Sequence, residues 1–94
     1  MTIVTCQAEL DISAASTLQQ QLLAVMQTRE PVEIEAQNVS RIHTAALQLF
    51  LSAIRDAQTL GLAFQWREPS SALVEGARLL GLTDPLHLGE FTVD

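Results

Sequence analysis

Hydrophobic and polar residues alternate along this chain with two different periods, which predict strands and helices in turn. Residues 32–36 alternate strictly and residues 62–66 alternate again, as strands with one covered face do. Residues 3–10 are rich in β-branched side chains early on and predict one edge-type strand or two short ones. Apolar residues at helical spacing predict three amphipathic helices, over residues 12–29, 44–60 and 70–80.

Residues that start or stop helices stand at the ends of these segments. Asp11 is a candidate N-cap for the first helix, with Ser13 as its rival, and Pro31 prevents that helix from continuing. Thr44 is a candidate cap for the second helix because its hydroxyl can satisfy a free backbone N–H. Gly61 stands where a left-handed C-terminal stop is expected.

The order of the elements predicts an α/β fold built on a small, mostly parallel sheet. We expect residues 37–42 to form a loop, and residues 82–88 to be turn-like with a short terminal element after them. Inner strands covered on both faces would be continuous apolar runs, so the alternation indicates helices packed mainly on one face. Ninety-four residues support one core, and we expect a single domain over residues 1–94.

Charge and composition exclude several classes of function. The net charge is −6, and the five arginines are scattered, so neither nucleic acid nor an anionic membrane surface is an expected partner. No apolar run of about 18 residues predicts a membrane span, and the start lacks the pattern of a signal peptide, so we expect a cytoplasmic protein. Cys6 is the single cysteine and is expected to be a buried, inert thiol.

Candidate catalytic chemistry is sparse. The four glycines form no phosphate-binding loop, and His43 and His87 lie far apart without a carboxylate at ligand spacing, so we expect no metal and no cofactor. Glu33 and Glu35 share one side of a strand, where a solvated polar face is favoured over a catalytic carboxylate pair. For Trp66, packing in the core or at its rim is favoured over an exposed interaction role.

The segment from Arg41 to Leu47 is the most informative for function. It joins a loop to a helix start, where free N–H groups and the helix dipole favour an anion or a docking partner. Thr44 either caps the helix or presents an exposed hydroxyl for phosphorylation or partner contact. The docking surface that we predict comprises Arg41, His43, Thr44, Ala45, Ala46, Gln48, Ser52 and Arg55.

Three segments of the chain, taken together in their order and spacing, resemble the STAS domain, which occurs in bacterial anti-sigma-factor antagonists and in the tails of sulfate transporters. Glu9-Leu10-Asp11 is similar to the family's Glu-Leu-Asp before its first helix. Residues 34–47, Ile-Glu-Ala-Gln-Asn-Val-Ser-Arg-Ile-His-Thr-Ala-Ala-Leu, are similar to its Leu-Asp-Leu-Ser-Gly-Val-x-x-Ile-Asp-Ser-Ser-Gly-Leu. Residues 72–82, Ala-Leu-Val-Glu-Gly-Ala-Arg-Leu-Leu-Gly-Leu, look like its closing helix and Gly-Leu turn.

This resemblance implies a stand-alone bacterial STAS protein that regulates signalling by docking, without catalysis. The implied partner is an anti-sigma-type kinase or a chemosensory histidine-kinase assembly; the alternative is a constitutive subunit bound to a transporter ATPase, as in a phospholipid-transport complex. The family's usual phosphoserine position holds Ala45, which has no hydroxyl, so Thr44 is the remaining candidate phospho-acceptor. An open sheet face or edge also allows a homodimer.

Overall fold

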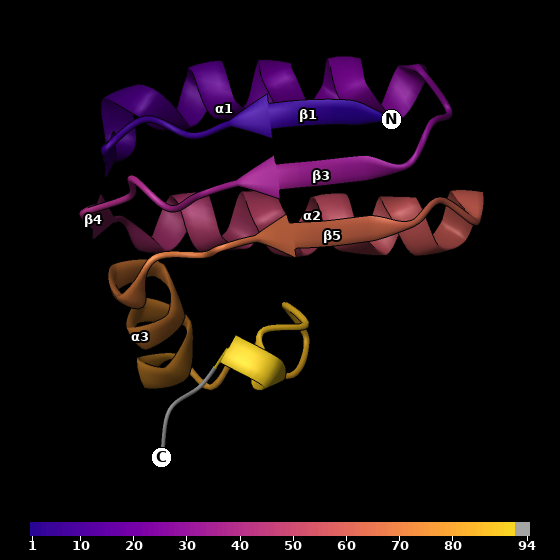
Figure 1. Cartoon of the computed structure of the whole chain (residues 1–94). Helices are drawn as coiled ribbons and strands as arrows, with labels where there is room; N and C mark the ends of the chain where they lie inside the picture. The colour runs from indigo at the N-terminus through magenta and orange to yellow at the C-terminus, as the bar shows by residue number, and fades with distance from the viewer. Residues whose placement is uncertain (92–94) are drawn as a thin grey trace.

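The computed structural model describes residues 1–91 and contains two parallel sheets and three α-helices (Figure 1). The elements follow one another as β1 (Thr2–Thr5), β2 (Glu9–Leu10), α1 (Ile12–Gln27), β3 (Val32–Glu35), β4 (Arg41–Ile42), α2 (Thr44–Leu60), β5 (Phe64–Arg67), α3 (Ser71–Leu79) and the 3₁₀ turn η1 (Gly89–Phe91). The predicted α/β class and the mostly parallel sheet are confirmed, and of the two alternatives for the opening segment the structure has two short strands.

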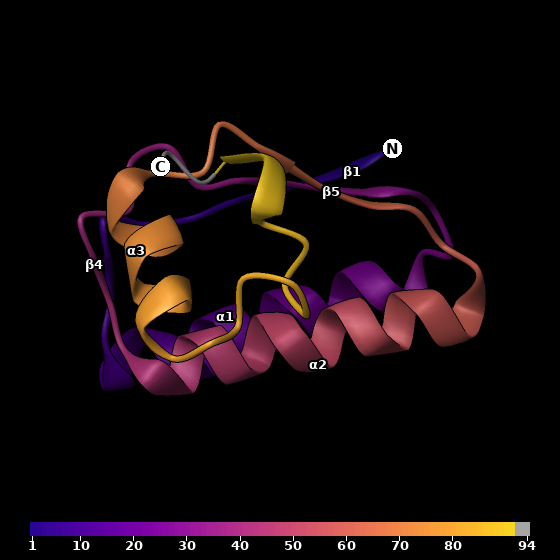
Figure 2. The ribbon, with the colours of Figure 1, turned by 90° about the horizontal axis from the view of Figure 1, so that it is seen from below.

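The larger sheet has the strand order β1-β3-β5, and all its pairs are parallel. Seen edge-on, it forms one layer, with α1 and α2 side by side beneath one face (Figure 2). The register aligns Val4, Ile34 and Trp66 across the three strands, and all three are buried against the helices. The one-sided packing predicted from the alternating strands is therefore confirmed.

The opposite face of this sheet is polar. The register brings Thr5, Glu35 and Arg67 together on it, and the Thr5 hydroxyl donates to Glu35 Oε2 over 3.3 Å. Arg67 Nη1 lies 3.7 Å from Glu33 Oε1 and 3.6 Å from Glu35 Oε1. The two carboxylates thus belong to an ion-paired polar face, which is the reading that the alternating pattern favoured.

The smaller sheet corrects the prediction of a loop at residues 37–42. Arg41–Ile42 forms β4, which pairs in parallel with β2. Backbone N–H groups on either side complete the ladder: Ser40 N donates to the Ala8 carbonyl over 2.7 Å, and His43 N donates to the Leu10 carbonyl over 2.8 Å. A strand of two residues is too short to show an alternating period, so the pattern could not reveal it.

Trp66 fastens the C-terminal segment to the core. Its indole Nε1 donates to the Leu86 carbonyl over 2.8 Å, and its ring meets those of Phe50 and Phe64 edge-on, with centroids 5.0 and 5.8 Å away. Residues after α3 therefore lie beside β5 (Figure 1). The predicted packing role of Trp66 is confirmed.

Two further sequence predictions agree with the structure. Cys6 is only 5% exposed, and its burial raises the pKa of the thiol from 9.0 to about 11, as expected of an inert buried cysteine. Gly61 ends α2 in the left-handed conformation at φ 70°, and its N–H donates to the carbonyl of Gln58 over 3.2 Å.

Candidate functional site

The two long helices begin side by side at one end of the molecule. The strand β2 leads into α1, β4 leads into α2, and the parallel pairing of β2 with β4 sets the two helix starts next to each other (Figures 1 and 2). Each helix start carries backbone N–H groups with no partner inside the helix, and the positive end of its dipole. The fold therefore concentrates donors at this end.

The first of these starts is capped by Asp11. Its Oδ1 accepts from Ala14 N over 2.9 Å and from the Ser13 hydroxyl over 2.7 Å. Ser13, the rival cap, thus supports Asp11 instead of replacing it. The Ser13 hydroxyl and the Ala14 N–H stabilise the carboxylate, and they lower the pKa of Asp11 below its ordinary value of 3.8.

A testable consequence is that Asp11 makes stability depend on acidity. The pKa of Asp11 is lower in the folded than in the unfolded chain, so its contribution is complete above pH 3.8 and disappears as pH falls through the folded value. Asp11→Asn keeps a capping oxygen but cannot titrate, so its unfolding free energy is expected to fall less steeply at acidic pH. Urea unfolding of both proteins across that range measures this, and parallel curves contradict it.

The start of α2 corrects the predicted role of Thr44. The N-cap is His43, whose Nδ1 accepts from Ala45 N over 3.0 Å, while Thr44 is the first helical residue. The accepting Nδ1 requires the proton of a neutral imidazole to sit on Nε2. The Thr44 hydroxyl is thereby left exposed, which is the other role considered for it.

Most of the predicted docking residues reach the surface together. Thr44, Gln48, Ser52 and Arg55 recur every three or four residues and form one exposed row along α2, which we call the α2 stripe. Beside its start lie the exposed Arg41 and His43 and the half-buried Ala45. These residues lie along one side of α2, from its first residue Thr44 to Arg55 in its third turn.

Ala46 is the exception among the predicted docking residues. Its exposed fraction is 0%, because it falls on the row of α2 that also carries the buried Phe50, Ala53 and Ala57. The side chain of Ala46 faces the core and cannot contact a partner in this conformation. We therefore remove it from the candidate surface.

An apolar groove next to the α2 stripe was not predicted. It runs between α1 and α2 and includes Leu23, whose exposed fraction is 54%, and the half-buried Leu49. Ile12, 68% exposed, lies on the same row of α1 as Leu23. The sequence contained one signal for this groove, the adjacent pair Leu22-Leu23. Neighbouring residues of a helix point in different directions, so the two side chains cannot both face the protein core. The remaining lining residues are Gln19, Leu22, Met26, Ser52, Ala53 and Asp56.

The two histidines of the chain lie in different parts of the fold. Among residues 1–91, no three His, Cys, Asp or Glu side chains gather in a way that could hold a metal ion. His87 contacts Gln58, with 3.3 Å between Nε2 atoms, and belongs to the C-terminal segment beside β5, while His43 caps α2. The arrangement offers an exposed mixed polar and apolar surface.

Comparison with known proteins supplies one match. A family model described as "Mlab, STAS domain" matches residues 2–90. No curated protein matches the chain. Within the described residues, no helix combines the length and the apolar character needed to cross a membrane.

Proposed function

Since the chain belongs to the STAS domain family, whose members act as protein-interaction and regulatory modules, we propose that it regulates a bacterial signalling pathway by docking, without catalysis. The observation that carries this proposal is the exposed corner where β4 enters α2. There His43 and Thr44 stand at the surface beside the α2 stripe. We also propose that the protein acts in the cytoplasm, because the signalling kinases that it would bind act there.

The composition of the corner suits a protein partner. An interface of ordinary size covers roughly 800 Å² on each partner and combines an apolar centre with a polar rim. The groove with Leu23 and Leu49 supplies the centre, and the α2 stripe with Arg41 supplies the rim. The proposed partner is an anti-sigma-type kinase or a chemosensory histidine-kinase assembly.

The side chains of the corner determine which of its residues can be phosphorylated. Ala45, at the family's usual phosphoserine position, offers no hydroxyl. Thr44 is exposed at the first position of α2, where an added phosphate would lie at the positive end of the helix dipole. We therefore propose that the protein either binds constitutively or is modified at Thr44.

One residue favours a second candidate function. Thr44 keeps a hydroxyl, as do STAS proteins that read Asp-Thr-Gly-Gly, such as the subunit of a phospholipid-transport complex. In that case the same corner would dock on a transporter ATPase and would stabilise the complex without switching. Copurification from cells followed by mass spectrometry separates the two partner classes, and the same spectra report any phosphate on Thr44.

Docking through the α2 stripe predicts a position-specific loss of binding. Gln48→Arg places a long charged side chain in the proposed interface, and we expect it to weaken partner binding at least about tenfold. Gln48 is exposed and arginine favours helices, so the fold is expected to remain intact. Titration calorimetry with the copurified partner measures the affinity.

The matched control is Gln65→Arg, which makes the same substitution at an exposed position on the polar face of the larger sheet, opposite the helices. It is expected to bind as tightly as the unmodified protein. If Gln48→Arg binds equally well, the docking surface lies elsewhere.

A further inference from the structure

The cap of α2 differs in its chemistry from the caps of the other two α-helices. Asp11 caps α1 through a carboxylate oxygen, and Ser70 caps α3 through its hydroxyl, which accepts from Leu73 N over 3.2 Å. The cap of α2 is the imidazole ring of His43. Histidine is the side chain whose charge ordinarily changes between pH 5 and 8. The start of α2 therefore depends on a group that titrates near neutral pH.

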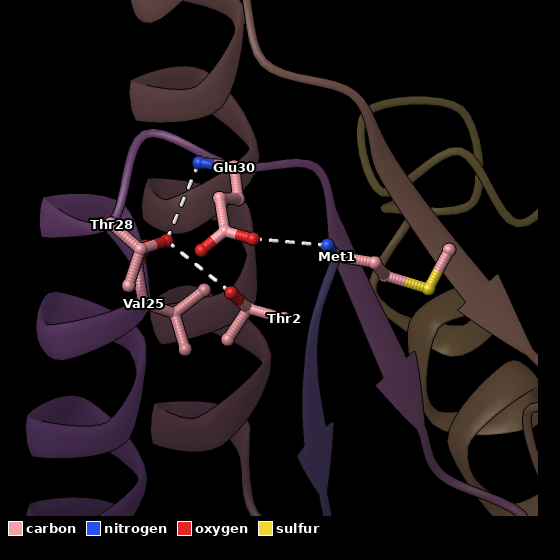
Figure 3. Close-up of polar contacts among 5 residues, drawn as sticks. All are labelled: Met1, Thr2, Val25, Thr28 and Glu30. Atoms are coloured by element: carbon pink, nitrogen blue, oxygen red, sulfur yellow. Dashed lines mark hydrogen bonds and ion pairs between the residues drawn. The ribbon is translucent and has the colours of Figure 1, made fainter.

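The polar contacts at the far end of α1 involve no histidine. Figure 3 shows the ammonium group of Met1 3.0 Å from Glu30 Oε1, and the hydroxyl of Thr2 3.3 Å from that of Thr28. Within residues 1–91, a histidine ring accepts a hydrogen bond from the helix backbone only at the start of α2. Protonation of a histidine therefore acts on the helix layer at the docking corner and leaves its opposite end unchanged.

A protonated ring is incompatible with the observed cap. His43 Nδ1 accepts from Ala45 N over 3.0 Å, and this is the only hydrogen bond of the ring among residues 1–91. An imidazolium ring carries a proton on both nitrogens and has no acceptor, so two N–H donors would face each other across this contact. Its positive charge would also lie at the positive end of the helix dipole. Both effects drive a protonated ring away from the helix start.

Backbone contacts limit how much of the corner opens when the ring leaves. His43 N donates to the Leu10 carbonyl over 2.8 Å, and the His43 carbonyl accepts from Ala46 N over 2.9 Å. These bonds do not involve the ring, and the side chain of Ala46 is fully buried. The change is therefore confined to Thr44 and Ala45, the first two residues of α2, and the fold around them persists.

Charged side chains of both signs lie on the elements next to this helix start. Those on β2, on β4, at the start of α1 and on α3 are Glu9, Arg41, Asp11, Glu75 and Arg78. Glu75 and Arg78 form an ion pair with each other, and the Asp11 carboxylate is engaged by Ser13 and Ala14. Within the described part of the chain, none of these charges is hydrogen-bonded or ion-paired to the His43 ring. The response to protonation is therefore set mainly by the cap itself.

We propose that His43 is a pH-sensitive cap whose protonation opens the first turn of α2. The hydrogen bond to Ala45 N exists only while the ring is neutral, so its contribution is complete at the alkaline end of the range from pH 5 to 8 and is lost as pH falls. Loss of one cap raises the population of the opened turn about fivefold. Because this turn belongs to the docking corner, the inference rests on the proposed function and makes partner binding weaker at acidic pH.

The amide proton of Ala45 reports on the cap without any partner. We expect its NMR resonance to move upfield as pH falls from 8 to 5, because a weakened hydrogen bond shifts an amide proton in that direction. The amide of Phe50, in the middle of α2, is expected to move much less. An Ala45 resonance that stays fixed while the His43 ring titrates overturns the proposal.

Two variants separate the cap from other titrating groups. His43→Asn keeps a preferred capping residue whose amide oxygen accepts at every pH, so its Ala45 resonance is expected to stay fixed between pH 8 and 5. His87→Asn removes the other histidine, at a position where φ is 58° and asparagine is tolerated, and is expected to keep the response of Ala45. A His43→Asn variant that responds like the unmodified protein contradicts the proposal.

Partner affinity distinguishes a failure of this inference from a failure of the proposed function. Calorimetry with the copurified partner is expected to show binding about fivefold weaker at pH 5 than at pH 8, relative to the same comparison for His43→Asn. The partner's own titration is common to both proteins and cancels in this ratio. A responding Ala45 with a ratio of one supports the cap and contradicts only the placement of the docking surface. An Ala45 that does not respond overturns the cap, whatever the affinities.

Discussion

Replacing Phe50 by alanine is expected to lower the free energy of unfolding by about 3–5 kcal/mol, the largest loss that we predict for a single side chain. Phe50 is fully buried on α2, and its ring meets Trp66 of the sheet edge-on at 5.0 Å. The change leaves a cavity between the helix layer and the sheet and removes the aromatic contact. Small domains have about 5–15 kcal/mol in total, so much of the stability would be lost. Urea unfolding gives the value.

Phe64→Ala is the matched control for this loss. Phe64 contacts the same Trp66, with centroids 5.8 Å apart, but it is only half-buried at the start of β5. Its truncation leaves less of a cavity, and we expect a loss of about 1–2 kcal/mol. Equal losses for the two variants would show that the Phe50 site is not the centre of the core.

Replacing Gly76 by leucine is expected to destabilise the protein by about 1–3 kcal/mol and to disturb the corner. A Cβ atom at Gly76 would lie 3.0 Å from Ile42 Cγ2, so α3 and β4 approach each other closely there. Leucine favours helices over glycine by about 0.8–1 kcal/mol, but the overpacking outweighs this gain. Because Ile42 directly precedes His43, partner binding is expected to weaken as well.

Ala72→Leu provides the comparison on the same helix. Ala72 lines a hollow with Pro69 and Arg78, which leaves room for the larger side chain. The free energy of unfolding of the Ala72→Leu variant is expected to differ from that of the unmodified protein by no more than about 0.5 kcal/mol, and its partner binding is expected to be unchanged. Urea unfolding and calorimetry on both variants measure the two effects. A Gly76→Leu variant as stable as Ala72→Leu would show that β4 moves aside without cost.

The fold was predictable because its long elements have strong periods. Residues 32–36 alternate strictly and residues 62–66 alternate again, and this alternation alone indicated that the helices lie on one face. Gly61 marked the end of α2 because a left-handed residue is most easily a glycine. The strand β4 was not predicted, because it has only two residues and forms by pairing with β2, which is distant in the sequence.

The candidate site was predictable in its position but not in its details. The exposed row of Thr44, Gln48, Ser52 and Arg55 follows from helical spacing. Ala46 was misplaced because alanine is compatible with both the surface and the core, and only the packing of α2 shows which it faces. His43 was not identified as the cap because its accepting role depends on a tautomer, which sequence statistics for caps do not describe.

The bond from Trp66 to the Leu86 carbonyl has a consequence for how the C-terminal part of the protein opens. It joins residues 20 positions apart, and α3 lies in the loop between them. Leu86 and Leu88 are fully buried, so opening this loop would expose apolar side chains and leave the Trp66 indole N–H without its acceptor. We therefore expect α3 and residues 82–88 to open together with the core and not as an independent unit.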